Sequence, residues 1–138
     1  MALSNEPVFP QTPKTGKAEF GASSEDTSMD PGTVSPTQIC VAGADGAVVT
    51  SIVYAGEVTV TAQKIVLWIQ LLGTGSWYIV SEHLQAAYTM ATTTAQTLVT
   101  IVDKTDSDAA IRLAGTDKLG ITHHVDLQGM AMSEWTDY

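Results

Sequence analysis

The chain lacks the features that would commit it to a disulfide framework, a nucleic acid or a charged membrane. It has one cysteine, Cys40, among 138 residues, so no disulfide can form within the chain. Only six residues are Lys or Arg, and the formal net charge is −9. This shortage of cations argues against nucleic-acid partners, which need a basic surface, and against binding to anionic membranes.

Long apolar runs are also missing. The longest apolar stretch, around Ile65, is far shorter than the roughly 20 residues that a membrane-spanning helix needs. The first four residues lack the basic start and apolar run of a signal peptide. We therefore expect a protein that is made and folded in a cytoplasm. Cys40 stands between Ile39 and Val41, which predicts a small buried hydrophobe and not a nucleophile.

Charged residues are scarce as well. They make up 15% of the chain, below the usual share of about a quarter, whereas apolar residues make up 44%. A length of 138 residues predicts one domain with a core of its own. The low charge is typical of a protein whose surface is partly covered by neighbours. An ordinary acidic β domain would have the same composition.

Proline is confined to the first part of the chain. All five prolines precede Thr37, and proline removes a backbone donor and resists regular structure. The sequence therefore predicts an extended Pro-rich arm and linker over residues 1–37 and a β-sandwich domain over residues 38–138. Within the arm, Val8 and Phe9 form an apolar anchor, and residues 17–20 have the pattern of a short strand.

The most apolar stretch runs from Lys64 to Glu82. Its two limbs are rich in β-branched and aromatic residues, and a Gly-rich turn at residues 73–76 separates them, which predicts a β-hairpin. In the first limb apolar side chains fall on both faces: Ile65, Leu67 and Ile69 on one, Val66 and Trp68 on the other. A strand that is apolar on both faces is expected to be central in its sheet.

The remainder shows short β segments separated by turns. Two turn signals are the Asp-Gly sequence at 45–46 and the Gly-Thr-Asp sequence at 115–117. Residues 83–94 are ambiguous, because 84–88 could form a helical turn but three threonines follow soon after. Seven or eight such strands predict an all-β fold, an antiparallel β-sandwich or jelly-roll-like barrel with an extended N-terminal arm.

No recognised catalytic or metal-binding motif is found. Adjacent His123 and His124 would point to opposite faces of a strand, so they cannot share one ion without a turn. The aspartates at 103, 106 and 108 lack the Gly and the terminal Glu of a calcium loop. Ser81, Glu82 and His83 are adjacent in sequence, which does not make a triad. We therefore expect no enzyme, no cofactor and no metal.

The aromatic residues leave two interpretations open. Trp and Tyr are common in cores and interfaces, where they contribute much of the binding energy. Trp77 and Tyr78, at the start of the second limb, could instead form a sugar-binding platform. The first interpretation predicts that they lie in the core or in an interface, and the second that they are exposed beside a glycan.

A series of short motifs gives the chain a resemblance to small virion proteins of tailed phages. The motifs are, in order, Asn5–Pro10, Gln11–Lys17, Val41–Gly46, Lys64–Ile69, Gly120–His123 and Asp137–Tyr138. Their order and spacing, more than any one of them, resemble the head decoration (cement) family. The central hairpin turn and residues 81–94 depart from that pattern.

The resemblance implies a β-rich, non-enzymatic capsid decoration protein that binds the outside of the head and bridges capsid subunits. It implies the major capsid protein and further copies of the chain, as a homotrimer, as partners, with no nucleic acid and no membrane. The protein would be made in the bacterial host cytoplasm and end on the capsid exterior of the virion. The interface residues expected are Val8, Phe9, Phe20, Trp77 and Tyr78. Alternatives are a tail or neck component, or a carbohydrate- or receptor-binding module of the particle.

Overall fold

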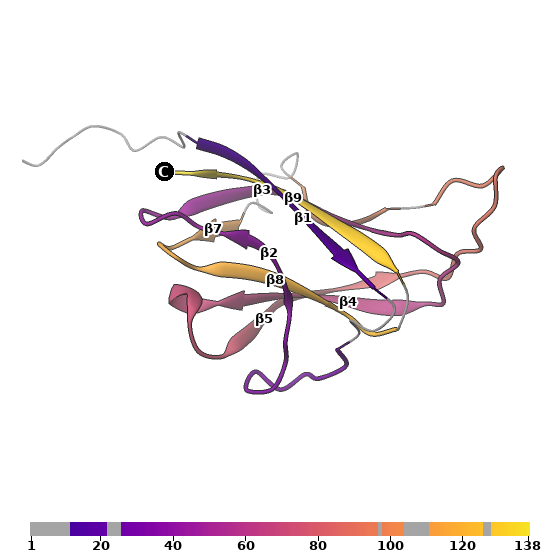
Figure 1. Cartoon of the computed structure of the whole chain (residues 1–138), viewed down its shortest axis with the longest axis horizontal. Coiled ribbons are helices and arrows are strands. Elements are labelled where there is room, and N and C mark those ends of the chain that lie inside the picture. Colours follow the sequence, from indigo (N-terminus) through magenta and orange to yellow (C-terminus); the bar gives the residue numbers. More distant parts are fainter. Residues whose placement is uncertain (1–11, 22–25, 97, 104–110, 126–127) are drawn as a thin grey trace, which may run out of the picture.

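A computed structural model describes residues 12–21, 26–96, 98–103, 111–125 and 128–138. These residues form nine β-strands and one short 3₁₀ helix (Figure 1). The elements are β1 (Thr12–Phe20), β2 (Thr37–Val41), β3 (Ala47–Gly56), β4 (Gln63–Gln70), η1 (Leu71–Gly73), β5 (Trp77–Gln85), β6 (Val99–Asp103), β7 (Ile111–Leu113), β8 (Lys118–His123) and β9 (Gly129–Asp137). In this part of the chain no helix is long and apolar enough to cross a membrane.

The strands form two antiparallel sheets. The first sheet has the order β1-β9-β3-β6, with β7 beside β3, and the second has the order β2-β8-β4-β5. Apart from β7, the first strand pairs with the last, the second with the next to last, and so on inward to the β4–β5 hairpin. This is the topology of a jelly roll. The predicted all-β fold is therefore confirmed.

The core lies between the two sheets and follows from the alternation of the strands. Along β9 every second residue is buried, from Gly129 to Asp137, as a strand with one face on a core requires. Ile52 of β3, Leu67 of β4 and Ile121 of β8 meet in this core, and none of the three has measurable exposure. The two sheets are thereby held face to face.

Strand β4 is buried on both faces, as its apolar pattern predicted. It lies between β8 and β5, so its backbone is paired on both sides. Ile65 and Leu67 face the core between the sheets, whereas Val66 and Trp68 form a second cluster. All four have no measurable exposure. The central position expected for this strand is confirmed.

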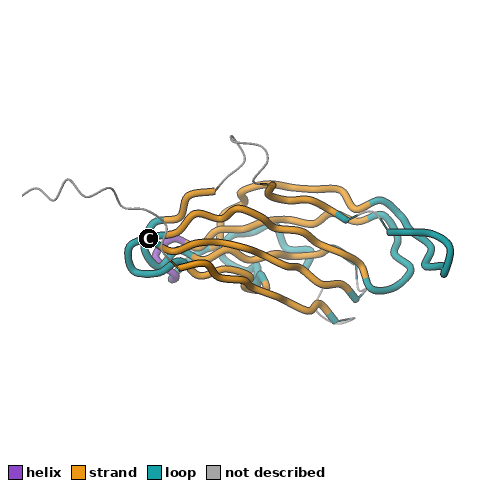
Figure 2. Tube along the Cα trace, turned by 90° about the horizontal axis from the view of Figure 1, so that it is seen from above, coloured by secondary structure: helices purple, strands orange, loops and turns teal. Residues whose placement is uncertain are grey.

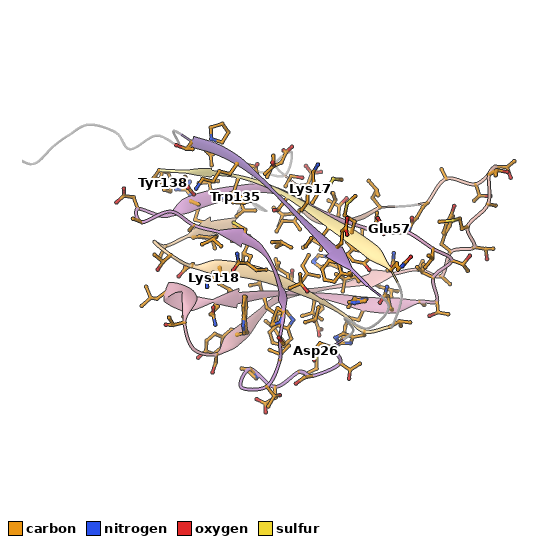
Figure 3. The ribbon with its side chains drawn as sticks, in the orientation of Figure 1. Lys17, Asp26, Glu57, Lys118, Trp135 and Tyr138 are labelled. Carbon is orange, nitrogen blue, oxygen red and sulfur yellow. The ribbon has the colours of Figure 1, made fainter. Side chains whose placement is uncertain are left out.

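The outer cover of β4 comes from residues 26–36. Val34 from this segment is buried against Val66 and Trp68. The segment is fixed to the second sheet at the Asp26 N–H, which donates to the His123 carbonyl at 3.1 Å. Figure 3 shows Asp26 on the side of the second sheet that faces away from the first. The segment is thus an outer layer over the second sheet.

The expected boundary between an arm at 1–37 and a domain at 38–138 was wrong. Strand β1 belongs to the first sheet and pairs with β9 from Thr12, opposite Asp137, to Phe20, opposite Gly129. Its alternate residues Ala18 and Phe20 supply core side chains. Proline does not prevent this, because β1 is an edge strand, where a missing N–H is tolerated. Residues 1–11 lie outside the described part.

Candidate interaction surface

Strand β5 is the outermost strand of the second sheet. Among the described residues it pairs with β4 alone, so the backbone N–H and C=O groups of its other edge have no strand partner there. Such an edge is a template on which another chain can add a strand. Figure 1 shows β5 at the margin of the second sheet, with η1 next to its start.

Exposed apolar side chains follow this edge strand and η1. They are Leu71 (51% exposed), Leu72 (67%), Tyr78 (50%), Ile79 (44%), Val80 (39%) and Leu84 (75%); together they form the β5 strip. The one acidic residue on the strand, Glu82, is in an ion pair with Lys64 at 2.8 Å. In a chain of net charge −9 the strip is therefore nearly neutral. Exposed apolar groups that gather along one strand and its neighbouring turn mark a candidate interaction site.

The register of β5 changes within the strip. Leu67 pairs with Ser81, but the next residue of β4, Trp68, pairs with Ile79. Val80 is thus an extra residue, a β-bulge, and bulges strengthen the local twist of an edge strand. The bulge allows adjacent residues 78–80 all to be exposed, which a regular strand over a core would not permit.

The loop at the start of the strip has a strained backbone. Leu72 has φ of 54°, in the left-handed region that a branched side chain avoids. The Asp117 carboxylate holds this conformation, because its Oδ1 accepts from the Leu72 N–H at 2.8 Å and its Oδ2 accepts from the Ala114 N–H at 3.0 Å. The fold therefore maintains Leu72 in an exposed and unfavourable conformation, a pattern typical of contact sites.

Phe20, expected at an interface, lies instead in the core. It is 1% exposed and contacts Tyr54 and His123 edge to face, at ring-centroid distances of 5.6 and 5.1 Å. That interface prediction was wrong, because β1 turns its even-numbered residues inward. The alternation of Ala18 and Phe20 with Lys17 and Glu19 predicted a short strand, but the surrounding prolines led to its assignment to the arm.

The other expected interface residues have different positions. Trp77 is half-buried, packs against the cluster of Val66 and Trp68, and has its ring beside Gly120. It is thus largely part of the outer layer, whereas Tyr78 belongs to the exposed β5 strip. Val8 and Phe9 lie outside the described residues, and an interface role for Tyr78 stays a prediction.

Five members of the strip, all except Tyr78, were missed by sequence reasoning. Leu71, Ile79 and Val80 belong to apolar runs that a strand pattern assigns to a core, and Leu84 stands between His83 and Gln85 in the stretch whose structure was ambiguous. The signal available was the pair of leucines directly before Gly73, since a turn leaves such residues little to pack against.

Cys40 is a buried hydrophobe, as predicted. It is 1% exposed, and burial, together with the nearby Asp137 charge, raises the pKa of its thiol to about 12. The thiolate is therefore scarce at neutral pH, and the side chain is inert.

Asp137 has a structural role near Cys40. Its carboxylate forms an ion pair with Lys14 of β1 and accepts the Gly43 N–H at 3.1 Å. Burial alone would raise the pKa of this carboxyl, but Lys14 and Gly43 outweigh burial and lower it. The group ties the first strand, the last strand and the β2–β3 turn together.

His83 lines a pocket at the end of β5. The pocket, of about 380 Å³, lies between the end of β5 and the start of β6. Burial lowers the pKa of His83, whose Nε2 lies 2.9 Å from Ser81 Oγ. The described lining residues include no Asp or Glu to form a pair with this histidine. Within the described part of the chain no group of three His, Cys, Asp or Glu is arranged for a metal.

Comparison with known proteins adds little to this geometry. No protein-family model matches the chain, and no curated protein does. Among solved structures, the chain is similar to the Eiger TNF from S. frugiperda, with 12% identity and a TM-score of 0.45 over 91% of this chain and 92% of that one. A likeness of this size transfers no property, so function must be argued from the surface.

Proposed function

We propose that this chain is a non-enzymatic structural protein of a tailed-phage particle, a capsid decoration protein that binds the outside of the head and bridges capsid subunits. The observation that carries the proposal is the β5 strip, an apolar and nearly uncharged surface on an unpaired strand edge. The resemblance of the motif order to phage decoration proteins supports it. The site of action is the capsid exterior of the virion, after synthesis in the host cytoplasm.

The strip suits an adhesive role in energy as well as in position. Complete burial of a Leu or Ile side chain contributes about 1.5–3 kcal/mol, and these side chains are only partly buried in the isolated chain. Each contact would be modest by itself. On a particle that presents many identical sites, linked contacts gain avidity without any new interaction.

The proposed partners are the major capsid protein and other copies of the chain in a homotrimer. Copies with a charge of −9 repel one another, so they associate best through a surface that carries little charge. The β5 strip is such a surface, because Lys64 compensates Glu82. A homo-oligomer would also hold several β5 edges at once, which strengthens attachment to a symmetric shell.

Attachment of purified protein to particles that lack it tests the proposal. Ile79→Lys places a charge in the middle of the strip, and Ala44→Lys places the same charge in the exposed β2–β3 turn. Co-sedimentation should fall at least about tenfold for Ile79→Lys, since burying a charge costs several kcal/mol, and stay unchanged for Ala44→Lys. Equal attachment of both variants would contradict the role of the strip.

Truncation can address the segment before β1. Removal of residues 1–36 would also remove β1 and the cover of the second sheet, so the fold itself would change. Removal of residues 1–11 alone leaves both intact and should weaken attachment if this segment contacts a neighbour. Quantification of the chain per particle then separates the alternatives, because hundreds of copies indicate the head and a handful indicate the neck or tail.

A further inference from the structure

The connection between β5 and β6 projects from the sandwich. Its residues 86–96, here called the tongue, pair with the β3–β4 connection where Tyr88 lies opposite Val60. Figure 1 shows this connection extending past the ends of the sheets on the side where β5 ends. Every residue from 89 to 95 is exposed. The tip of the tongue is therefore accessible to a neighbouring molecule.

Hydrogen bonds hold the tongue in a defined conformation. Val60 and Tyr88 exchange backbone hydrogen bonds at 2.8 and 2.9 Å. The Tyr88 hydroxyl donates to the Thr94 carbonyl at 2.6 Å, and Thr59 Oγ1 accepts from the Met90 N–H at 3.0 Å. Because the tip is exposed, these bonds and not core packing fix it. A segment that is ordered before it makes a contact loses less conformational entropy on binding.

The tongue is uncharged in a chain of net charge −9. The sequence has no Asp, Glu, Lys, Arg or His from Leu84 to Val102, and none in residues 58–62 beside the tongue. Acidic copies of the chain repel one another through their charges. A projecting segment without charge is therefore a place where two copies approach at low electrostatic cost.

Met90 is the large apolar side chain of the tip. It is 51% exposed and belongs to neither core cluster. It is also absent from the residues that line the pocket of its own chain. Methionine is flexible and polarisable, and it is common at surfaces that bind other proteins. Within the described part of the chain, Met90 thus has the position of a contact residue.

The pocket between β5 and β6 is a recess of matching character. Residues 83–88, Gln96 and residues 98–100 line its volume of about 380 Å³, and the described lining contains no Asp, Glu, Lys or Arg. Leu84 and Leu98 are 75% and 50% exposed. Burial lowers the pKa of His83, so this lining group is neutral at neutral pH. A neutral, partly apolar recess suits an uncharged apolar side chain.

We propose that the tongue of one copy docks in the pocket of a second copy, with Met90 against Leu84 and Leu98. This rests on the proposed function, in which copies of the chain associate, and it names the contact they use. Tongue and pocket are different surfaces, so the contact is heterologous, and heterologous contacts form rings when the rotation closes. A ring of three is the proposed homotrimer, and the strip from Leu71 to Val80 stays free for the capsid.

Sedimentation velocity of the full chain over a range of concentrations tests the proposal. Met90→Asp places a charge at the tip, and Met29→Asp, at a methionine of the outer layer that is 38% exposed, is the matched control with the same net charge. The association constant should fall at least about tenfold for Met90→Asp and stay at the parent value for Met29→Asp. A parent chain that is monomeric at millimolar concentration, or equal association of the two variants, would overturn the proposal.

Disulfide formation locates the contact. An oxidised mixture of Met90→Cys and Leu98→Cys chains should give a cross-linked pair that contains one of each. A mixture of Met29→Cys and Leu98→Cys is the control and should give none. The native Cys40 is buried and does not compete. Cross-linking of Met90→Cys with itself as readily as with Leu98→Cys would show that tips meet tips, and the pocket would then not be the partner.

Attachment to particles is measured separately, so the two proposals fail in different ways. A parent chain that forms the cross-linked pair but does not sediment with particles would contradict the decoration role and support the docking of tongue and pocket. A parent chain that attaches to particles yet stays monomeric in solution and gives no Met90–Leu98 cross-link would overturn the docking alone.

Discussion

The two ends of the sandwich differ in how their buried polar groups are hydrogen-bonded. Loops collect at both ends of the strands (Figure 2). At the turn end, formed by the β2–β3 turn, η1 and the β7–β8 turn, the carboxylates of Asp117 and Asp137 accept backbone N–H groups. At the pocket end, the amides of Gln85 and Gln96 keep N–H groups unpaired among the described residues.

This difference bears on how much each end stabilises the fold. Donors satisfied within the chain contribute to folding, whereas buried donors left unpaired reduce stability. Figure 3 shows Trp135, Lys118 and the C-terminal Tyr138 toward the turn end, and Glu57 at the other. The turn end thus holds the first and last strands together, and the pocket end bears the cost of unpaired donors.

The largest expected effect is at Asp117. Asp117→Ala removes the acceptor for both the Leu72 and the Ala114 N–H and should lower the free energy of unfolding by about 3 kcal/mol, because both donors are left in a partly buried position. Urea unfolding measures this. Asp117→Asn keeps one acceptor oxygen and should lose about half as much. An unchanged stability in Asp117→Ala would remove the contrast between the two ends.

A smaller effect is expected at Asp137, and it depends on pH. The pKa of Asp137 is below its ordinary value of 3.8 in the folded chain: burial opposes this, but Lys14 and Gly43 prevail. Its stabilisation is therefore complete above the unfolded pKa and is lost as the pH falls through the folded pKa. Asp137→Asn should cost about 1–2 kcal/mol at neutral pH.

The loss of stability at acidic pH supplies the control for Asp137→Asn. Below pH 3.8 the parent chain should lose stability more steeply than Asp137→Asn, because the asparagine cannot take up the proton. Thermal unfolding between neutral pH and pH 3 measures the two slopes. Parallel curves would show that the contacts of Asp137 are not stabilising.

The strained residue at the turn end should respond in the opposite direction. Leu72→Gly relieves the cost of φ at 54° and loses little packing, since Leu72 is 67% exposed. The unfolding free energy should rise by about 0.5–1 kcal/mol. Leu71→Gly is the matched control, because Leu71 has no positive φ, and it should destabilise slightly. Equal losses in both would show that the strain is small.

The smallest change in stability is expected at the pocket end. Gln96→Leu replaces an unpaired amide by an apolar group and should change the unfolding free energy by less than about 0.5 kcal/mol, or raise it. Gln63→Leu is the control, because Gln63 donates to Gln85 and accepts from the Val125 N–H at 3.1 Å. Its loss should be about 2 kcal/mol. A large loss in Gln96→Leu would show that its amide is paired in solution.

Sequence patterns predicted much of the fold because alternation is a local property. Ile65 and Trp68 show that β4 is apolar on both faces, and this was enough to identify a central strand. The turn predicted from Asp45 and Gly46 is present. Gly46 has a φ of 101°, which glycine adopts easily. The ambiguous residues after His83 continue β5 as far as Gln85, because pairing with Gln63 decides their conformation.

The site could not be predicted in the same way. Phe20 was assigned to an interface as part of the Pro-rich arm, and the sequence gives no local sign that β1 pairs with the distant β9. Gln85 and Gln96 belong to no motif, and only the fold brings their amides to one side of Gly56. The exposure of Tyr78 and Ile79 depends on the bulge at Val80, which arises from pairing and not from local preference.

The pairing of β1 with β9 has a consequence for synthesis. The two strands lie at opposite ends of the chain yet pair along nine residues, from Thr12 with Asp137 to Phe20 with Gly129. During translation β1 leaves the ribosome first, with Ala18 and Phe20 exposed, and its partner strand emerges last. Pairings of this separation fold in milliseconds to seconds. A growing chain therefore cannot complete its first sheet before β9 has been made, and until then the inner face of β1 lacks its partner strand.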